Sequence, residues 1–210
     1  MIQIRSSGEV ISSSEANLKR LRRAFARNHY VILPCFFPSP LLKRIQSQIA
    51  CAKFYTRIHG GGIAKELCMR RNETLALLFF LVNDPRLFHL IQQITGCGQI
   101  GSFIGRVYQL LPGSDHYGDW HDDLGKYRMN ALSINLSPGV YKGGALQLRD
   151  RNSHRVFHEV HNPGCGDALL FKISPTLEHR IDPVEGKNSK FAFAGWFRSK
   201  PKFWRTSYPV

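Results

Sequence analysis

The sequence predicts a mainly β fold, a barrel or sandwich of short strands supported by helices from the N-terminal half. Short apolar runs separated by turn residues fill the chain from about residue 99 onward. Helical spacing of apolar residues dominates the part before it, and the chain lacks the strand–helix alternation of a parallel sheet. A jelly roll is therefore the architecture that we expect.

The N-terminal half contains signals for three helices and one strand. Ser12 and Glu15 form a capping box ahead of the first helix, and residues 30–37 read as a strand. Ser39 and Pro40 begin a second helix. The third helix is expected to begin at the cap formed by Asn83, Asp84 and Pro85, and to end at Gly96.

The C-terminal half contains five runs typical of strands, at residues 102–111, 130–136, 144–150, 167–173 and 190–197. With 210 residues, the chain suits one domain. We expect residues 1–98 to form a mostly helical support with an early strand, and residues 99–200 to form the β core. The glycines at 60–62 precede a helical stretch in this interpretation, so they are expected to form a mobile loop without a phosphate-binding role.

Charge and cysteine content restrict the class of protein. The net charge of +14 would attract anionic partners, but the basic run at residues 18–27 is also typical of the solvated face of an amphipathic helix. The five cysteines form no CxxC pair, which indicates a reducing, cytoplasmic location. No apolar run reaches the roughly 20 residues of a membrane helix, so no membrane partner is expected.

The segment WHDD carries the first candidate for chemistry. His121 and Asp123 are two residues apart, and on an extended segment such residues project to the same face, whereas Asp122 would face the surface. His179, beyond the strand at 167–173, can supply a third ligand. Two histidines and a carboxylate form the facial triad of non-heme iron(II) oxygenases. The pair alone is a weak signal in a chain with nine histidines.

Lys190 provides independent support, because it opens the apolar strand at 190–197. An inward-facing lysine is costly to bury unless it meets an anion, and the distal carboxylate of 2-oxoglutarate is such an anion. Three other cations remain alternatives for this role: Arg180, Lys187 and Arg198. A second histidine group, His154, His158 and His161, falls on a strand hairpin, where the three side chains are expected to be solvated rather than to bind metal.

Five ordered features together point to a family: the HxD motif, the turns Gly143–Gly144 and Gly166–Asp167, His179 followed by Pro183–Val184, and Lys190 before GlyTrpPhe. This order resembles the prolyl-hydroxylase-like branch of the 2-oxoglutarate and iron(II) dioxygenases, over residues 100–198. The resemblance implies a double-stranded β-helix and makes residues 99–200 the catalytic core.

The same resemblance implies roles for individual residues. It implies His121, Asp123 and His179 as ligands of Fe(II), and Lys190 as the partner of the oxoacid's C5 carboxylate. Tyr108 matches a position where relatives place a hydroxyl near the oxoacid, although packing in the barrel explains a tyrosine there equally well. Asn135 lies where some relatives also contact the oxoacid.

The resemblance further implies hydroxylation of an unactivated C–H bond, using 2-oxoglutarate and O2 and releasing succinate and CO2. The expected substrate is an amino-acid side chain, free or in a peptide or protein, or a natural-product intermediate. A nucleic-acid demethylase is the first alternative, because the chain is basic. A non-catalytic, cupin-like metal-binding protein is the second.

Overall fold

The computed structural model describes residues 1–12, 14–59, 62, 64–113, 116–125, 127–161 and 163–200. The helices are α1 (Glu15–Asn28), α2 (Ser39–Ala50), α3 (Glu73–Val82) and α4 (Pro85–Thr95). The strands are β1 (Gln3–Ile4), β2 (Val10–Ile11), β3 (Tyr30–Leu33), β4 (Phe54–Ile58), β5 (Ala64–Met69), β6 (Ser102–Leu110), β7 (Tyr117–His121), β8 (Arg128–Asn135), β9 (Lys142–Gly143), β10 (Leu146–Asp150), β11 (Val156–Val160), β12 (Ala168–Lys172), β13 (Leu177–Ile181), β14 (Val184–Glu185) and β15 (Lys190–Arg198).

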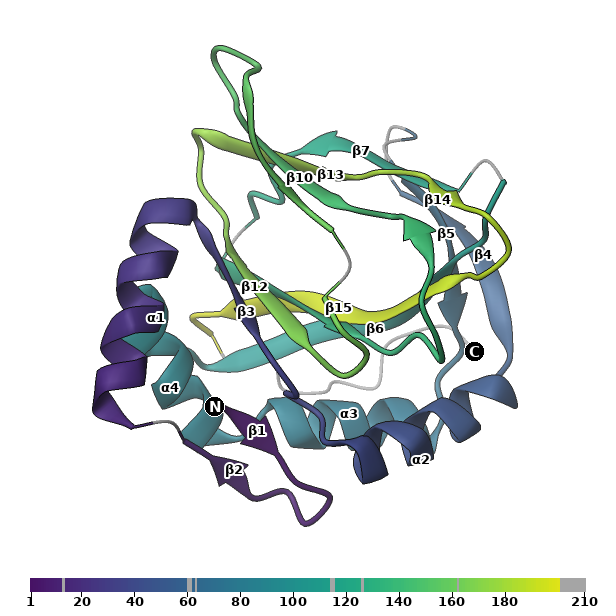
Figure 1. The fold of residues 1–210 in the computed structure, drawn as a ribbon, viewed down its shortest axis with the longest axis horizontal. Helices are drawn as coiled ribbons and strands as arrows, with labels where there is room; N and C mark the ends of the chain where they lie inside the picture. The colour runs from purple at the N-terminus through teal and green to yellow at the C-terminus, as the bar shows by residue number, and fades with distance from the viewer. Residues whose placement is uncertain are drawn as a thin grey trace.

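One antiparallel sheet carries most of the strands and curls on itself, which confirms the expected jelly roll (Figure 1). Its strand order is β11-β10-β13-β7-β5-β6-β15-β8-β12-β3, with β4 added beside β5. The two ends of this path approach each other through aromatic side chains. The ring centroids of His29 and Phe157 are 5.8 Å apart, and those of Tyr30 and His158 are 5.2 Å apart.

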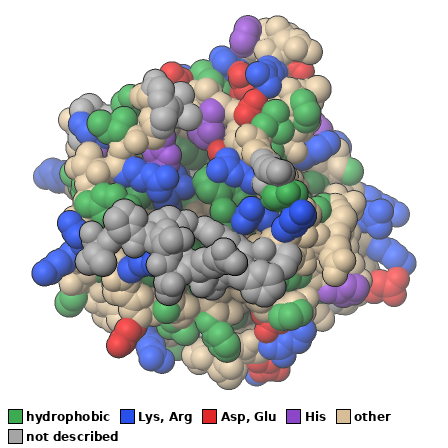
Figure 2. Space-filling model, turned by 180° about the vertical axis from the view of Figure 1, so that it is seen from behind, with side chains coloured by type: hydrophobic (Ala, Val, Ile, Leu, Met, Phe, Trp, Pro, Cys, Tyr) green, Lys and Arg blue, Asp and Glu red, His purple; other side chains and the backbone are tan. Residues whose placement is uncertain are grey.

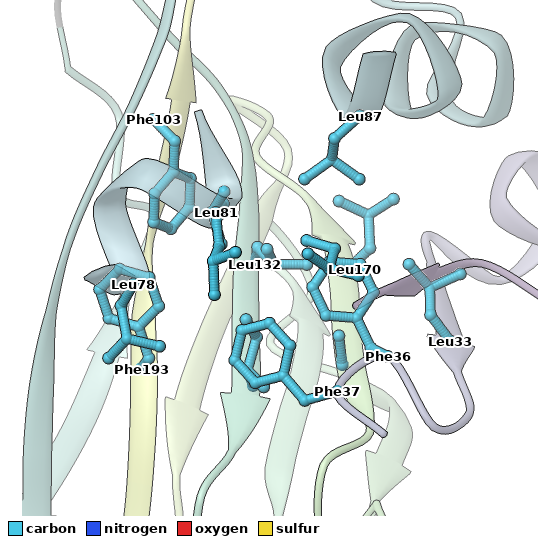
Figure 3. Packing of buried hydrophobic residues seen from close by; sticks show 14 of the residues in the cluster. Leu33, Phe36, Phe37, Leu78, Leu81, Leu87, Phe103, Leu132, Leu170 and Phe193 are labelled. Carbon is cyan, nitrogen blue, oxygen red and sulfur yellow. The ribbon is translucent and has the colours of Figure 1, made fainter. Parts of the chain in front are cut away.

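The helices cover the outer face of the β6-β15-β8-β12 part of the sheet (Figure 1). The main hydrophobic core lies in this layer, where side chains from α3, α4 and the β3–α2 connection meet the sheet (Figure 3). Phe103 and Phe193 pack edge to face with ring centroids 5.5 Å apart, and both are almost fully buried. The inner face of the same strands is thereby left to line the interior of the curl.

Helix ends mostly follow the signals in the sequence. Pro40 lies in the first turn of α2, and Asp84 caps α4 by accepting a hydrogen bond from the backbone N–H of Arg86. Gly96 ends α4 in the left-handed conformation. The capping box at Ser12 is wrong: Ser14 caps α1 instead, because its hydroxyl accepts from the N–H of Asn17.

The structure corrects two further expectations for the N-terminal half. The glycines at 60–62 follow β4 and precede β5, so they join a β-hairpin and do not precede a helix; Gly60 and Gly61 lie outside the described residues. The strand expected at 30–37 ends at Leu33. The sequence did not predict the β4–β5 hairpin, because most β4 side chains are exposed and the strand therefore shows no clear alternation of apolar residues.

No single described helix is long and apolar enough to cross a membrane. The helices α3 and α4 satisfy length and composition only when taken together, with a bend of 56° between them. Both helices contribute buried side chains to the core against the sheet.

Candidate metal and cosubstrate site

A cavity of about 1140 Å³ opens inside the curled sheet. Strands β6, β8 and β15 form one wall, and β7, β10 and β13 contribute to the opposite wall. Much of the deep lining is apolar, as this list shows: Leu110, Leu146, Leu169, Phe171, Ile181 and Ala192. Polar and charged side chains also line the cavity, and their positions decide its chemistry.

His121, Asp123 and His179 meet in this cavity, as the sequence predicted. Their ligand atoms all lie within 4.8 Å of one another, and among the described residues no other group of three such side chains is this close. Asp123 Oδ1 is 3.6 Å from His121 Nε2, and Asp123 Oδ2 is 3.2 Å from His179 Nε2. One face of a single ion could contact all three.

The strands hold the two imidazoles side by side. His121 ends β7 and lies opposite His179 in β13, with ring centroids 4.3 Å apart. His121 Nδ1 lies 2.5 Å from the carbonyl oxygen of Asp119, so this nitrogen donates its proton there and Nε2 is directed toward Asp123. Burial, followed by the neighbouring His179, lowers the pKa of His121, which favours the neutral ring that metals require.

Asp123 reaches the site by a different route from the one that the sequence suggested. It lies beyond the end of β7 with φ of 55°, a left-handed conformation, and not on an extended strand. Asp122 faces outward as expected, where its carboxylate pairs with Arg151 at 2.7 Å. The side chains of His121 and Asp123 thus converge because the chain turns sharply, and not through strand alternation.

Two side chains that sequence reasoning missed hold the Asp123 carboxylate. The indole Nε1 of Trp196 donates to Asp123 Oδ2 at 2.7 Å, and Arg128 donates to the Asp123 carbonyl at 3.0 Å and to Oδ1 at 3.3 Å. The guanidinium of Arg128 also stacks 3.7 Å from the centre of the Trp196 ring. Trp196 lay within the GlyTrpPhe run, where its position six residues after Lys190 puts both on the same side of β15.

Replacing Trp196 by phenylalanine is expected to weaken metal binding about 10- to 100-fold, because the ring is kept but the hydrogen bond to Asp123 is lost. Calorimetric titration of the apoprotein with Mn(II) measures this. Trp120→Phe is the matched control, since Trp120 adjoins His121 but stacks on Arg149 at 4.1 Å on the outer face. Equal affinities for Trp196→Phe and the unmodified protein would contradict the role of the indole N–H.

Lys190 points into the cavity from the start of β15 and is 7% exposed. Its Nζ donates to the carbonyl oxygen of Gly144 at 2.7 Å and lies 5.9 Å from the centre of the Tyr141 ring. The structure records no ion pair between Lys190 and a carboxylate among the described residues. Burial lowers the pKa of Lys190 to about 8, partly offset by the more distant Asp182.

This pKa predicts how oxoacid binding depends on pH. Lys190 carries its proton below about pH 8, whereas above that pH it must take one up when a carboxylate binds. The affinity of the Mn(II)-loaded protein for 2-oxoglutarate should therefore fall between pH 8 and 9, by up to roughly tenfold. Calorimetry at several pH values measures the trend. Lys190→Arg should remove it, since guanidinium stays charged; an unchanged slope in this variant would assign the titration to another group.

The alternative cations lie elsewhere. Arg180 faces outward from β13, where it donates to Gln147 and stacks on Trp120, and Lys187 is exposed. Arg198 lies 5.9 Å from the centre of the Tyr127 ring. None of the three is among the described residues that line the cavity.

Tyr108 and Asn135 both line the cavity. The Tyr108 hydroxyl is hydrogen-bonded to Ser133, and burial, followed by the charge of Glu66, raises its pKa to about 12, so it remains a neutral donor. The Asn135 side chain bonds backbone groups at both ends: it donates to the carbonyl of Pro163 and accepts from the N–H of Ser137. Tyr108 thus remains available to a ligand, whereas Asn135 holds loops in place.

The cavity wall also carries a cluster of charged and polar side chains, Glu66, Arg106 and His59, that the sequence analysis did not predict. Glu66 on β5 forms an ion pair with Arg106 on β6, and it also lies 2.9 Å from His59 Nε2. Burial alone would raise the pKa of Glu66, but the bonds from His59 and Arg106 bring it to about 2. The charge of Arg106 is therefore already neutralised within the wall.

The histidines of the β10–β11 hairpin do not gather. His158 packs against Tyr30, and His161 pairs with Glu159 at 2.9 Å. His154 is exposed in the turn, with φ of 55°. His154 and His161 are solvated as expected, whereas His158 is half-buried, so the expectation of a fully solvated histidine group is wrong at His158.

The donor set fits ferrous iron and its oxoacid. Two imidazoles and one carboxylate, at one side of a cavity, suit iron(II) and leave room for further ligands. A buried ammonium whose hydrogen bond goes to a neutral carbonyl suits the distal carboxylate of 2-oxoglutarate.

Comparison with known proteins agrees with this assignment. The family model of the 2OG-Fe(II) oxygenase superfamily matches residues 106–198. Comparison with curated proteins gave no match.

Solved structures provide the second comparison. A 2OG-Fe(II) oxygenase family oxidoreductase from Burkholderia pseudomallei is similar with a TM-score of 0.66 and 15% identity, over 96% of this chain and 97% of that one. A Pseudomonas putida prolyl-4-hydroxylase gives 0.66 and 18%, over 87% and 99%. A Trichoplax adhaerens prolyl hydroxylase, in complex with a peptide fragment of the hypoxia inducible factor oxygen degradation domain, gives 0.64 and 18%, over 90% and 94%.

Proposed function

Because the family model of the 2OG-Fe(II) oxygenase superfamily matches residues 106–198, we propose that the chain is such an oxygenase and hydroxylates an unactivated C–H bond of an amino-acid side chain, free or in a peptide. Enzymes of this superfamily use Fe(II), 2-oxoglutarate and O2, so the non-catalytic alternative is set aside. The observation that carries the proposal is that His121, Asp123 and His179 share one cavity with the buried Lys190.

In this proposal His121, Asp123 and His179 hold the iron, and Lys190 holds the oxoacid's distal carboxylate. When bound, iron and 2-oxoglutarate supply the oxidising chemistry, in which O2 is consumed, the oxoacid becomes succinate and CO2, and a C–H bond becomes C–OH. Trp196 and Arg128 fix the orientation of the Asp123 carboxylate before any ligand arrives. The residues thus contribute binding and orientation, which is the protein's share of such catalysis.

The surroundings of Lys190 favour a carboxylate over water. The Lys190 ammonium is at a buried end of the cavity, where Leu110, Tyr141 and Ala192 pack together. In such surroundings a charge pair is much stronger than in solvent. Tyr108, from the neighbouring strand, can add a neutral O–H donor to the bound oxoacid.

The proposal is tested by measuring succinate formed from 2-oxoglutarate, aerobically, with Fe(II) and a panel of free amino acids and short peptides. A substrate should raise the rate above the uncoupled background and acquire one oxygen atom. Anaerobic protein with Fe(II) and 2-oxoglutarate should also show a weak visible charge-transfer band. Absence of the band, with metal binding intact, would refute oxoacid chelation at this site.

A further inference from the structure

Lys190 is held in an unusual way for a charged side chain. Figure 2 shows lysine and arginine side chains on the surface of one face, where water can surround them. Lys190 is buried instead, and its Nζ donates to the carbonyl oxygen of Gly144 at 2.7 Å. A neutral carbonyl holds the ammonium group without cancelling its charge, and it takes only one of the three N–H donors. The backbone around Gly144 therefore bears directly on the proposed oxoacid site.

Pro183 explains why the Gly144 carbonyl is available to a side chain. The ladder of β9 with β14 continues the register of the ladder of β10 with β13, and this register places Gly144 opposite Pro183. The N–H of Gly144 donates to the Pro183 carbonyl at 2.9 Å. A residue in an antiparallel sheet can return such a bond to its neighbour, but proline has no N–H to donate. The Gly144 carbonyl is thus left to accept from Lys190.

The turn at Gly143 and Gly144 makes room for the stem of Lys190. Both glycines have left-handed backbone, with φ of 67° and 63°. A Cβ atom added to Gly144 would lie 3.1 Å from Lys190 Cδ. It would also lie 3.1 Å from Tyr141 Cε2 and 3.2 Å from Val184 Cγ2, so a methyl group here is crowded on three sides. Lysine has the most rotatable bonds of the three neighbours, and we expect it to be the one displaced.

We propose that Gly144 and Pro183 are positioning residues for Lys190, which together fix its ammonium group where it binds the distal carboxylate of the oxoacid. This inference rests on the proposed function, in which Lys190 has that role. Gly144 supplies the carbonyl that the ammonium group contacts and the space in which the stem lies. Pro183 leaves that carbonyl without a bond from the neighbouring strand. An ammonium group that is already in place lowers the entropic cost of binding.

The first test compares two glycine variants by calorimetric titration of the Mn(II)-loaded protein with 2-oxoglutarate. Gly144→Ala should weaken oxoacid binding at least about tenfold, with the affinity for Mn(II) unchanged. Gly186→Ala is the matched control, because Gly186 also has left-handed backbone, with φ of 79°, but an added Cβ would lie 4.0 Å from Lys142 Cδ, which is an ordinary contact. Equal losses in the two variants would assign the effect to backbone strain and overturn the inference.

A double-mutant cycle tests whether Gly144 acts through Lys190. Lys190→Met alone should weaken 2-oxoglutarate binding, and adding Gly144→Ala to that variant should change the affinity by less than about twofold, because the residue that Gly144 positions is already gone. A loss from Gly144→Ala that is undiminished in the Lys190→Met background would show that the added methyl group acts on the cavity directly. That result would contradict a positioning role.

Pro183→Ala tests the second positioning residue. Pro183 is exposed, so the variant is expected to fold, and its new N–H lies opposite the Gly144 carbonyl. Sharing the carbonyl should weaken 2-oxoglutarate binding about threefold, and this loss should also vanish in the Lys190→Met background. An unchanged affinity in Pro183→Ala would remove the proline from the proposal.

The same titrations separate this inference from the proposed function. If Lys190→Met bound 2-oxoglutarate as tightly as the unmodified protein, the assignment of Lys190 itself would fail. A loss in Lys190→Met without any loss in Gly144→Ala would overturn the positioning role alone.

Discussion

Replacing Asp123 by alanine is expected to lower the affinity for Fe(II) at least about 100-fold, because the variant loses one of the three metal ligands. Loss of a residue that only supports a ligand already lowers metal affinity about 10- to 100-fold. The variant should form no succinate at iron concentrations that saturate the unmodified protein. Anaerobic calorimetry with Fe(II), followed by the succinate assay, measures both effects. The loss should be larger than that caused by removing the Trp196 hydrogen bond, since Asp123 contacts both histidines directly.

Asp122→Ala is the matched control, because it removes the adjacent carboxylate, which pairs with Arg151 on the surface. That variant should bind iron and form succinate like the unmodified protein. If Asp122→Ala and Asp123→Ala had equal effects, the left-handed turn at Asp123 would not select the ligand that we propose. Circular dichroism of both variants excludes general unfolding as the cause.

Replacing Lys190 by methionine is expected to weaken 2-oxoglutarate binding at least about 30- to 100-fold, with metal affinity unchanged. Loss of one partner from a buried charge pair costs about 2–5 kcal/mol, and each 1.4 kcal/mol is tenfold in affinity. Methionine keeps the volume of the side chain, so the cavity keeps its shape. Calorimetric titration of the Mn(II)-loaded variant with 2-oxoglutarate measures the affinity. Lys187→Met is the matched control, because Lys187 is exposed on the surface.

The same variant should be more stable than the unmodified protein when no oxoacid is present. Lys190 is buried with a neutral carbonyl as its hydrogen-bond partner, and its lowered pKa reflects the cost of that burial. Removing the charge relieves the cost, which raises the melting temperature by about 2–4 °C for each kcal/mol in a chain of this size. A lower melting temperature for Lys190→Met would show that the ammonium stabilises the fold instead of serving a ligand.

The sequence predicted those parts of the fold that depend on local patterns. The five apolar runs after residue 99 correspond to β6, β8, β10, β12 and β15, because each strand has buried apolar side chains that are visible in the sequence as a short apolar run. The hairpin β4–β5 and strand β7 were not predicted, because their side chains are mostly exposed or half-buried and form no apolar run in the sequence. They belong to the sheet through pairing with distant strands, which local patterns do not encode.

The site was predictable as far as residue identity and order define it. His121, Asp123, His179 and Lys190 meet in one cavity, and the recognition of the superfamily is confirmed. The prolyl hydroxylases among the structural neighbours share the fold at 18% identity, and the prolyl-hydroxylase-like branch stays a prediction. Roles of single residues remain proposals. The contacts of Trp196 with Asp123 and of Arg106 with Glu66 were missed, since each joins residues far apart in the sequence.

The bond between Trp196 and Asp123 gives the protein an intrinsic optical reporter. Indole emission responds to nearby charge, and the Trp196 ring lies under the Arg128 guanidinium while its N–H meets a metal-ligand carboxylate. Neutralisation of that carboxylate by any divalent ion therefore changes the field across the ring. The occupancy of the site can be followed in the unlabelled protein, with Trp196→Phe to identify the signal against those of Trp120 and Trp204.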